Sequence, residues 1–194
     1  MTKSVDFYFD FISPYSFLAY KKLNSLNKNN KININYKPIL LGGLHKLGNI
    51  TAPAFNERKM KNMKNDSELV ARKNNIEFRW NDKFPINSLD LMRGYLVTNE
   101  KNKKKFFDLF FDAYWKNNVD LSNNKNFESI LDNCLIDKDS FFKEIQNQKT
   151  KEELKQLTDK AFKKDIFGAP TFIVNNKIFW GQDRLDYALD EYNS

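Results

Sequence analysis

The stretch of residues 5–23 constrains the fold most, because its hydrophobic pattern changes from strand to helix within a few positions. Apolar side chains occupy every second position of residues 5–11, the period of a β-strand, and Asp10 falls on the other side of this alternation. From Tyr15 onward apolar residues recur at three- and four-residue steps, which is typical of a helix with one buried face. The stretch therefore predicts a buried strand that runs directly into a helix, with Ser13 at the junction.

Ser13 has a structural and a functional interpretation. Pro14 is tolerated at the first position of a helix, because the N–H that it lacks would have no partner there. Ser13 then takes the N-cap position, where its hydroxyl accepts a hydrogen bond from the helix backbone. In the functional interpretation, the same positive helix end stabilises an anion such as a thiolate or phosphate, and the hydroxyl donates a further hydrogen bond to it.

The counts of cysteine and histidine exclude several kinds of site. Cys134 is the single cysteine of the 194 residues, so no internal disulfide can form, and we expect an inert buried thiol there. His45 is the single histidine, so the chain offers no cluster of soft ligands and we expect no metal site. With no recognisable partner nearby, His45 is expected to be a surface or structural histidine.

Charge and hydropathy bear on partners and location. The formal net charge of +7 invites a nucleic-acid hypothesis, but the basic residues are mostly scattered lysines without a zinc-finger, RNP or helix-turn-helix signature. We therefore expect no nucleic-acid partner. Residues 1–4 lead into the first strand without an apolar leader, and no stretch approaches about 18 consecutive apolar residues. The expectation is a soluble, cytoplasmic protein with no membrane partner.

The order of the remaining elements predicts an α/β fold. A second strand over residues 31–40 completes a right-handed strand-helix-strand unit, and a glycine-containing loop over residues 41–49 follows it. Helices with short breaks fill residues 53–162, and residues 171–192 predict two strands and a helix. This is a thioredoxin-like βαβ…ββα core with a large all-helical insertion. We assign residues 1–44 and 157–194 to the thioredoxin-like domain and residues 45–156 to the inserted helical domain.

The segment before the third strand predicts a ligand-facing backbone. A proline that begins a strand lacks a donor, and the Gly-Ala-Pro-Thr setting suggests a cis bond between Ala169 and Pro170. Such a bond leaves the backbone N–H and C=O of Ala169 free for a ligand and should face Ser13. Asn175 and Asn176 can adopt the positive φ values of the tight turn that follows.

Two segments carry a family resemblance that spans nearly the whole chain. Asp-Phe-Tyr-Phe-Asp-Phe-Ile-Ser-Pro-Tyr-Ser at residues 6–16 and the motifs of residues 167–185 resemble kappa-class glutathione transferases and 2-hydroxychromene-2-carboxylate isomerases. These are relatives of the DsbA-like disulfide oxidoreductases. The resemblance implies a glutathione-dependent enzyme that acts on a small electrophilic substrate, and it allows a homodimer.

The resemblance also implies roles for individual residues. Ser13 would donate a hydrogen bond to the glutathione sulfur, and Ala169 with Pro170 would hold the cysteinyl backbone as an added strand. Gln182 and Asp183 would bind the γ-glutamyl end, although Asp183 has a plain alternative as a helix N-terminal carboxylate. The glycyl carboxylate would lie near Asn49 and Lys59, with Lys61 and Lys64 as alternatives to Lys59.

The mechanism that the resemblance implies is nucleophilic. Glutathione thiolate would attack an electrophile in a transferase, or add reversibly to a conjugated double bond in an isomerase, and the sequence leaves both outcomes open. Substrate choice is expected to depend on the helical insertion, around Phe84, Pro85 and Trp80. The alternative function is a non-redox thioredoxin-fold module that binds peptides as a chaperone. A disulfide oxidoreductase is disfavoured, because serine stands at the attacking position.

Overall fold

The computed structural model describes residues 3–29 and 31–194. Residues 1–2, at the start that we predicted to lack a leader, and residue 30, in the first predicted domain, lie outside the described residues. The elements in chain order are β1 (Val5–Phe9), α1 (Pro14–Leu26), β2 (Ile34–Pro38), α2 (Leu41–Leu47), the 3-10 turn η1 (Pro53–Phe55), α3 (Glu57–Lys73), α4 (Leu89–Val97), α5 (Glu100–Trp115), α6 (Asn124–Cys134), α7 (Lys138–Gln146), α8 (Gln148–Phe162), β3 (Thr171–Val174), β4 (Lys177–Trp180), the 3-10 turn η2 (Gln182–Arg184) and α9 (Leu185–Asn193).

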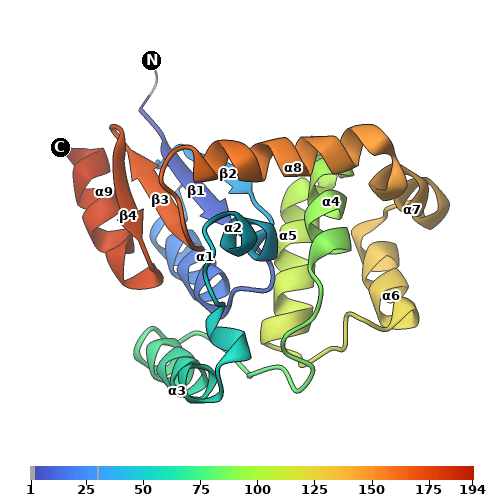
Figure 1. Ribbon diagram of the computed structural model, residues 1–194, viewed down its shortest axis with the longest axis horizontal. Coiled ribbons are helices and arrows are strands. Elements are labelled where there is room, and N and C mark those ends of the chain that lie inside the picture. The colour runs from blue at the N-terminus through green and yellow to red at the C-terminus, as the bar shows by residue number, and fades with distance from the viewer. Residues whose placement is uncertain (1–2, 30) are drawn as a thin grey trace.

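The described strands form one sheet in the order β2-β1-β3-β4. β1 pairs parallel with β2 and antiparallel with β3, and β3 pairs antiparallel with β4. Helices α4 to α7 lie beyond the β2 edge of the sheet, α9 lies beside β4 at the other edge, and α8 returns along the top of the molecule from α7 to the sheet (Figure 1). The predicted α/β core with a helical insertion is therefore confirmed.

Helices cover both faces of the sheet. Phe7 and Phe9 of β1 pack in a cluster with side chains of α1, α5 and α9. Tyr8 points to the opposite face and packs with Leu44 of α2 and Ala161 of α8. Because both faces are covered, the side of the strand that carries Tyr8 and Asp10 is buried as well, and Asp10 is 0% exposed.

The aromatic face of α5 joins the insertion to the sheet. Phe107 and Phe111 lie 4.5 and 4.7 Å, centroid to centroid, from Phe9 and Phe11 respectively. The indole Nε1 of Trp115 donates to the Phe11 carbonyl oxygen at 2.8 Å. One hydrophobic cluster therefore runs across the boundary that we predicted near residues 45 and 156, and the division into two domains stays a prediction.

Residues 41–47 form helix α2, so the predicted loop there is wrong. Glycine at positions 42 and 43 lowers helix propensity by about 1 kcal/mol per residue, and this cost favours a loop when the sequence is considered locally. Two long-range contacts offset it. The Leu41 N–H donates to the Asp10 carboxylate at 2.8 Å, and Leu44 is fully buried against the sheet.

Several local predictions near the helix and strand ends are confirmed. Ser13 caps α1, and Asn175 and Asn176 have φ values of 49° and 64° in the turn between β3 and β4. The predicted Ala169–Pro170 cis bond is present, and the Phe84–Pro85 bond is also cis.

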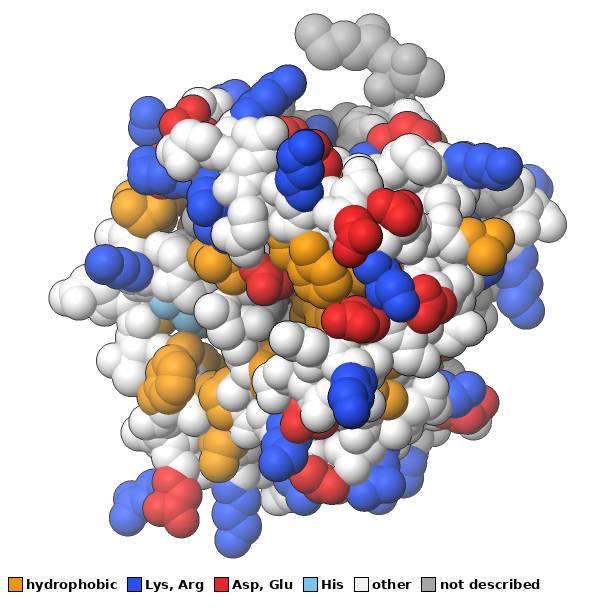
Figure 2. Space-filling model, turned by 90° about the vertical axis from the view of Figure 1, so that its right-hand side faces the viewer, with side chains coloured by type: hydrophobic (Ala, Val, Ile, Leu, Met, Phe, Trp, Pro, Cys, Tyr) orange, Lys and Arg blue, Asp and Glu red, His pale blue; other side chains and the backbone are white. Residues whose placement is uncertain are grey.

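The surface shows how charge is distributed. On the face in Figure 2, lysine and arginine side chains alternate with acidic ones rather than forming a patch of one sign. Among the described residues, no helix is long and apolar enough to span a membrane. The absence of a nucleic-acid partner stays a prediction.

Candidate functional site

Ser13 lies where β1 ends and α1 begins, and it is 3% exposed. Its Oγ accepts a hydrogen bond from the Ser16 N–H at 3.1 Å and donates one to the Ala169 carbonyl oxygen at 2.9 Å. The predicted juxtaposition of Ser13 with the Ala169–Pro170 bond is therefore present. The prediction that this carbonyl is free is wrong, because the Ser13 hydroxyl is close enough to donate to it.

A cavity of about 840 Å³ lies beside Ser13. Its wall combines the start of α1, helix α2, residues 50–55, α3, residues 84–88, residues 167–170 and residues 180–184. The predicted site residues that line it are Ser13, Lys59, Ala169, Pro170, Gln182 and Asp183. Asn49 is not in the wall of this cavity, although its neighbour Ile50 is. The assignment of these residues to a bound molecule stays a prediction.

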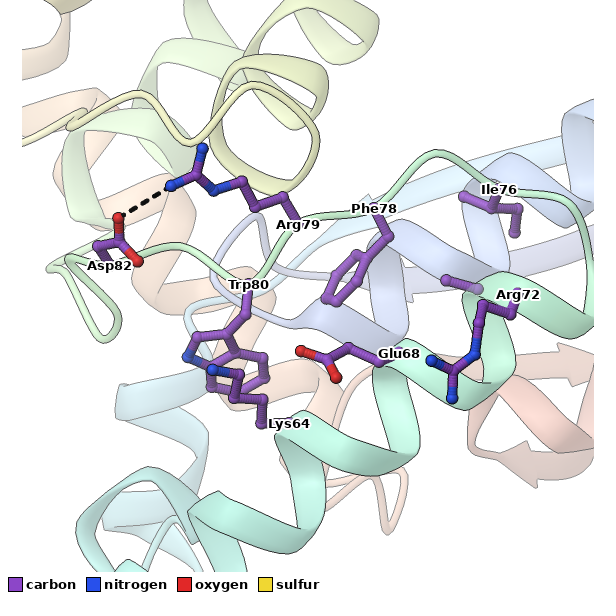
Figure 3. Close-up of a pocket in the computed structure, with 9 residues that line it drawn as sticks. Lys64, Glu68, Arg72, Ile76, Phe78, Arg79, Trp80 and Asp82 are labelled. Atoms are coloured by element: carbon purple, nitrogen blue, oxygen red, sulfur yellow. Dashed lines mark hydrogen bonds and ion pairs between the residues drawn. The ribbon is translucent and has the colours of Figure 1, made fainter.

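The structure separates the three candidate lysines of α3. Lys59 lines the cavity beside Ser13, whereas Lys64 lines a different cleft of about 350 Å³ between α3 and residues 76–82. The exposed Lys61 lines neither of these two cavities. Figure 3 shows Lys64 next to Trp80 at this second cleft, where Arg79 pairs with Asp82 at 3.3 Å. The helical phase of α3 therefore favours Lys59 for the main cavity, and it places Trp80 away from the substrate pocket that we predicted.

The segment at the start of η2 is tied to the Ala169–Pro170 bond. The Gly181 N–H donates to the Pro170 carbonyl oxygen at 2.9 Å, and Gly181 has a φ of 108°, which favours glycine. Asp183 follows with a carboxylate that is 58% exposed and lies 3.3 Å from the Arg184 guanidinium. Asp183 lines the cavity and precedes α9 by two residues, although among the described residues no side chain caps the start of α9 with a hydrogen bond, so its ligand-binding and helix-end interpretations both stay predictions.

Asp10 is a site-supporting residue that sequence reasoning missed. One carboxylate oxygen accepts from the Ile12 N–H at 3.1 Å, and the other accepts from the Leu41 N–H at 2.8 Å and the Ser88 hydroxyl at 3.1 Å. These three partners all line the cavity, so Asp10 holds together three segments of its wall. Burial raises the pKa of the Asp10 carboxyl to about 6, against the lowering effect of its hydrogen bonds.

His45 also lines the cavity, a position that the sequence did not predict, and its expected surface or structural role stays a prediction. Burial lowers the pKa of its imidazole, which favours the neutral form at pH 7. The signal that could have found it is the helical spacing of Leu41, Leu44 and His45, which puts all three on neighbouring positions of α2. Phe84 and Pro85 line the same cavity, as predicted.

The thiol of Cys134 does not belong to this site. Cys134 is fully buried at the end of α6, and burial raises the pKa of its thiol to about 11, as expected for an inert thiol. Within the described part of the chain, no three histidine, cysteine, aspartate or glutamate side chains gather in a way that could hold a metal ion.

Comparison with known proteins shows the family. Residues 4–193 match the sequence profile of the DSBA-like thioredoxin domain. The chain belongs to this family. This DsbA-like chain is 28% identical over 194 residues to the 2-hydroxychromene-2-carboxylate isomerase of Sphingobium xenophagum, with 99% of this chain and 98% of that protein covered. It is 23% identical over 202 residues to human glutathione S-transferase kappa 1, with 96% and 89% covered. The resemblance inferred from the sequence is thereby confirmed.

Solved structures agree on the fold of this DsbA-like protein. A 2-hydroxychromene-2-carboxylate isomerase superposes with a TM-score of 0.87 at 24% identity, covering 97% of this chain and 94% of that one. The cytosolic disulfide reductase DsbM from Pseudomonas aeruginosa, solved with GSH, superposes with a TM-score of 0.66 at 10% identity, covering 98% and 96%. At these identities the likeness shows the fold alone.

Proposed function

We propose that the chain is a glutathione-dependent isomerase or transferase, in which bound glutathione thiolate adds to an electrophilic, conjugated or aromatic small molecule. One observation carries this proposal: the Ser13 hydroxyl at the N-terminus of α1 faces the Ala169–Pro170 bond on a cavity of about 840 Å³. Relatives named as isomerase and as transferase each cover nearly the whole chain. The chain is accordingly an enzyme of the isomerase or transferase kind.

The charges around Ser13 support thiolate formation. A free cysteine thiol has a pKa of about 8.5 and is mostly protonated at pH 7. The positive end of the 13-residue helix α1 lowers the pKa of a thiol placed beside it, and a hydroxyl donor lowers it further. In this mechanism the Ser13 hydroxyl turns from the Ala169 carbonyl to the sulfur. The Ala169 carbonyl then accepts from the glutathione backbone instead, as in the pairing of an added strand.

The two ends of glutathione would be held by opposite charges on the cavity wall. Lys59 would pair with the glycyl carboxylate and Asp183 with the γ-glutamyl ammonium, and Gln182 would add hydrogen bonds at the second end. The sulfur would then lie between them, next to Ser13. In an isomerase the thiolate adds to a conjugated double bond, the resulting single bond rotates, and elimination regenerates the thiolate. In a transferase the thioether is the product.

Calorimetry tests the proposed function directly. Glutathione should bind, and the dipeptides Cys-Gly and γ-Glu-Cys should bind more weakly, because each lacks one terminal residue and so carries the charge of that end in a different place. A chemically unfolded polypeptide should give no binding heat. Binding of that polypeptide without any binding of glutathione would contradict the proposal and return the chain to the peptide-binding alternative.

Replacement of Asp183 by asparagine should raise the dissociation constant for glutathione about threefold to tenfold, measured by calorimetry. A charge-assisted bond is lost, but solvent screens a carboxylate that is 58% exposed, so the effect stays below that of a buried charge. Cys-Gly, which has no γ-glutamyl ammonium, should bind the variant and the wild type equally. Asp186→Asn is the control, because this exposed carboxylate pairs with Lys22 outside the cavity wall. Equal weakening of both ligands by Asp183→Asn would mean that Asp183 only supports the start of α9.

A further inference from the structure

The charges on the cavity wall restrict the second substrate. Among the described residues that line the cavity, the cationic side chains are Lys59 and Arg184. Lys59 is assigned to the glycyl carboxylate in the proposed function. The Arg184 guanidinium lies 3.3 Å from the Asp183 carboxylate, where the γ-glutamyl end would add its own α-carboxylate as a second anionic partner. Asp66 adds a negative charge to the wall. Once glutathione is bound, no unpaired cation of the described wall faces the remaining space.

The imidazole of His45, which also lines this wall, does not act as a cation at neutral pH. His45 is half-buried, and the desolvation that lowers the pKa of its imidazole favours the neutral ring. The Ser88 hydroxyl already donates a hydrogen bond to the buried Asp10 carboxylate. Neither side chain therefore provides a counter-charge for an anionic substrate.

The rest of the wall is largely apolar, and part of it is held firmly. Phe84 packs against Trp80 and Trp115 with ring centroids 4.8 and 5.6 Å away, so it cannot move aside without breaking these contacts. Phe167 and Trp180 pack together at 4.6 Å on the other side. Further apolar side chains of the wall are Leu41, Ile50, Phe55 and Ile86.

We propose, resting on the proposed function, that the electrophile of this enzyme is an uncharged, apolar conjugated molecule, and that a carboxylate-bearing electrophile is disfavoured. A carboxylate placed against this wall would lose water without gaining a partner of opposite charge, which is unfavourable in any site of low polarity. The substrate named for the isomerase relatives is a carboxylate. This chain therefore differs from them in substrate class, within the same chemistry.

For an uncharged enone the step is balanced as follows. The glutathione thiol first loses its proton to solvent. The sulfur electron pair forms a bond to the β-carbon, the carbon–carbon π pair moves toward the carbonyl as an enolate, and a proton from solvent then adds to the α-carbon. The product is a neutral ketone carrying a thioether to glutathione, and no oxidant or reductant is required.

A matched pair of electrophiles tests this proposal. 4-Phenylbut-3-en-2-one and its 4-carboxyphenyl counterpart share the reacting carbons and differ by one carboxylate. We expect kcat/KM for the neutral enone to exceed that for the carboxylate about tenfold to hundredfold, after subtraction of the uncatalysed reactions. The two corresponding saturated ketones, which cannot react, should bind to the glutathione-loaded protein with the same order of affinity, as measured by calorimetry. This binding measurement decides the question if turnover is slow. Equal or reversed preference in binding would overturn the proposal.

A gain-of-function variant makes the test specific to the wall charge. Ile86→Lys should reduce the preference for the neutral ligand over the carboxylate ligand, because the added cation improves binding of the carboxylate. Ile86→Gln, which adds polarity without charge, should leave this preference unchanged. Phe55→Lys repeats the test at a side chain that is 77% exposed and so tolerates substitution. If the lysine variants leave the preference unchanged, wall charge is not its cause and the inference is wrong. Calorimetry with glutathione alone separates this result from failure of the proposed function, which would show as no glutathione binding at all.

Discussion

Replacing Ser13 by alanine should slow turnover about tenfold to hundredfold while the affinity for glutathione changes little. A hydrogen bond to a charged group is worth about 1.5–3 kcal/mol, and this bond would act on the sulfur anion alone. The backbone and the two charged ends of the tripeptide would still be held by Ala169, Lys59 and Asp183. Thiolate absorbance of bound glutathione, titrated with pH, measures the effect: the thiol pKa should rise in the variant toward the value of about 8.5 for a free thiol.

The capping role of Ser13 needs its own control. The hydroxyl also accepts from the Ser16 N–H, and loss of an N-cap costs about 1 kcal/mol of stability. Asp137→Ala removes an equivalent cap, from α7, where the carboxylate accepts from the Ser140 N–H at 2.8 Å. This control should lower stability without altering the thiol titration. If Ser13→Ala behaves in the same way, Ser13 is a helix cap and the catalytic assignment is wrong.

Replacing Asp10 by asparagine should lower the free energy of unfolding in a pH-dependent way. Asparagine offers one acceptor oxygen and one donor group, so either the Leu41 or the Ile12 N–H loses its acceptor, at a cost of about 1–3 kcal/mol. In the wild type, burial raises the pKa of this carboxyl from 3.8 to about 6. Between these values the folded protein holds a proton that the unfolded chain has released, so wild-type stability falls as the pH rises through this range.

The sign of this effect makes the prediction specific. Ionisation of the Asp10 carboxyl lowers the free energy of unfolding of the wild type by up to about 3 kcal/mol between pH 4 and pH 7. Asparagine does not titrate, so the variant shows no such decrease. The stability difference between wild type and Asp10→Asn is therefore expected to be largest near pH 4 and to shrink toward pH 7, as measured by urea unfolding at several pH values. Asp6→Asn is the control, because Asp6 lies on β1, which ends just before Asp10, and its partly exposed carboxylate accepts from Asn35. A difference independent of pH would mean that Asp10 does not titrate in the folded protein.

The features that could be predicted from the sequence are those that short segments determine. Alternation over residues 5–11 and the Ser-Pro pair specify the junction of β1 and α1, because strand period and capping depend on neighbouring residues. Asn175 and Asn176 specify the turn between β3 and β4 in the same way, since both adopt positive φ values. The family resemblance rests on these two local segments and was therefore visible before any contact was known.

Only the tertiary structure decided which side chains surround the cavity. Asp10 was expected simply to alternate with apolar neighbours, yet it joins Leu41 and Ser88, which lie 31 and 78 residues away in the sequence. These contacts also favour a helix over the glycine-containing segment after β2, and so bring His45 into the cavity wall. The choice of Lys59 over Lys64 likewise follows from how α3 is rotated against its neighbours. Burial and long-range hydrogen bonds outweigh local propensity at these positions, and neither can be derived from neighbouring residues alone.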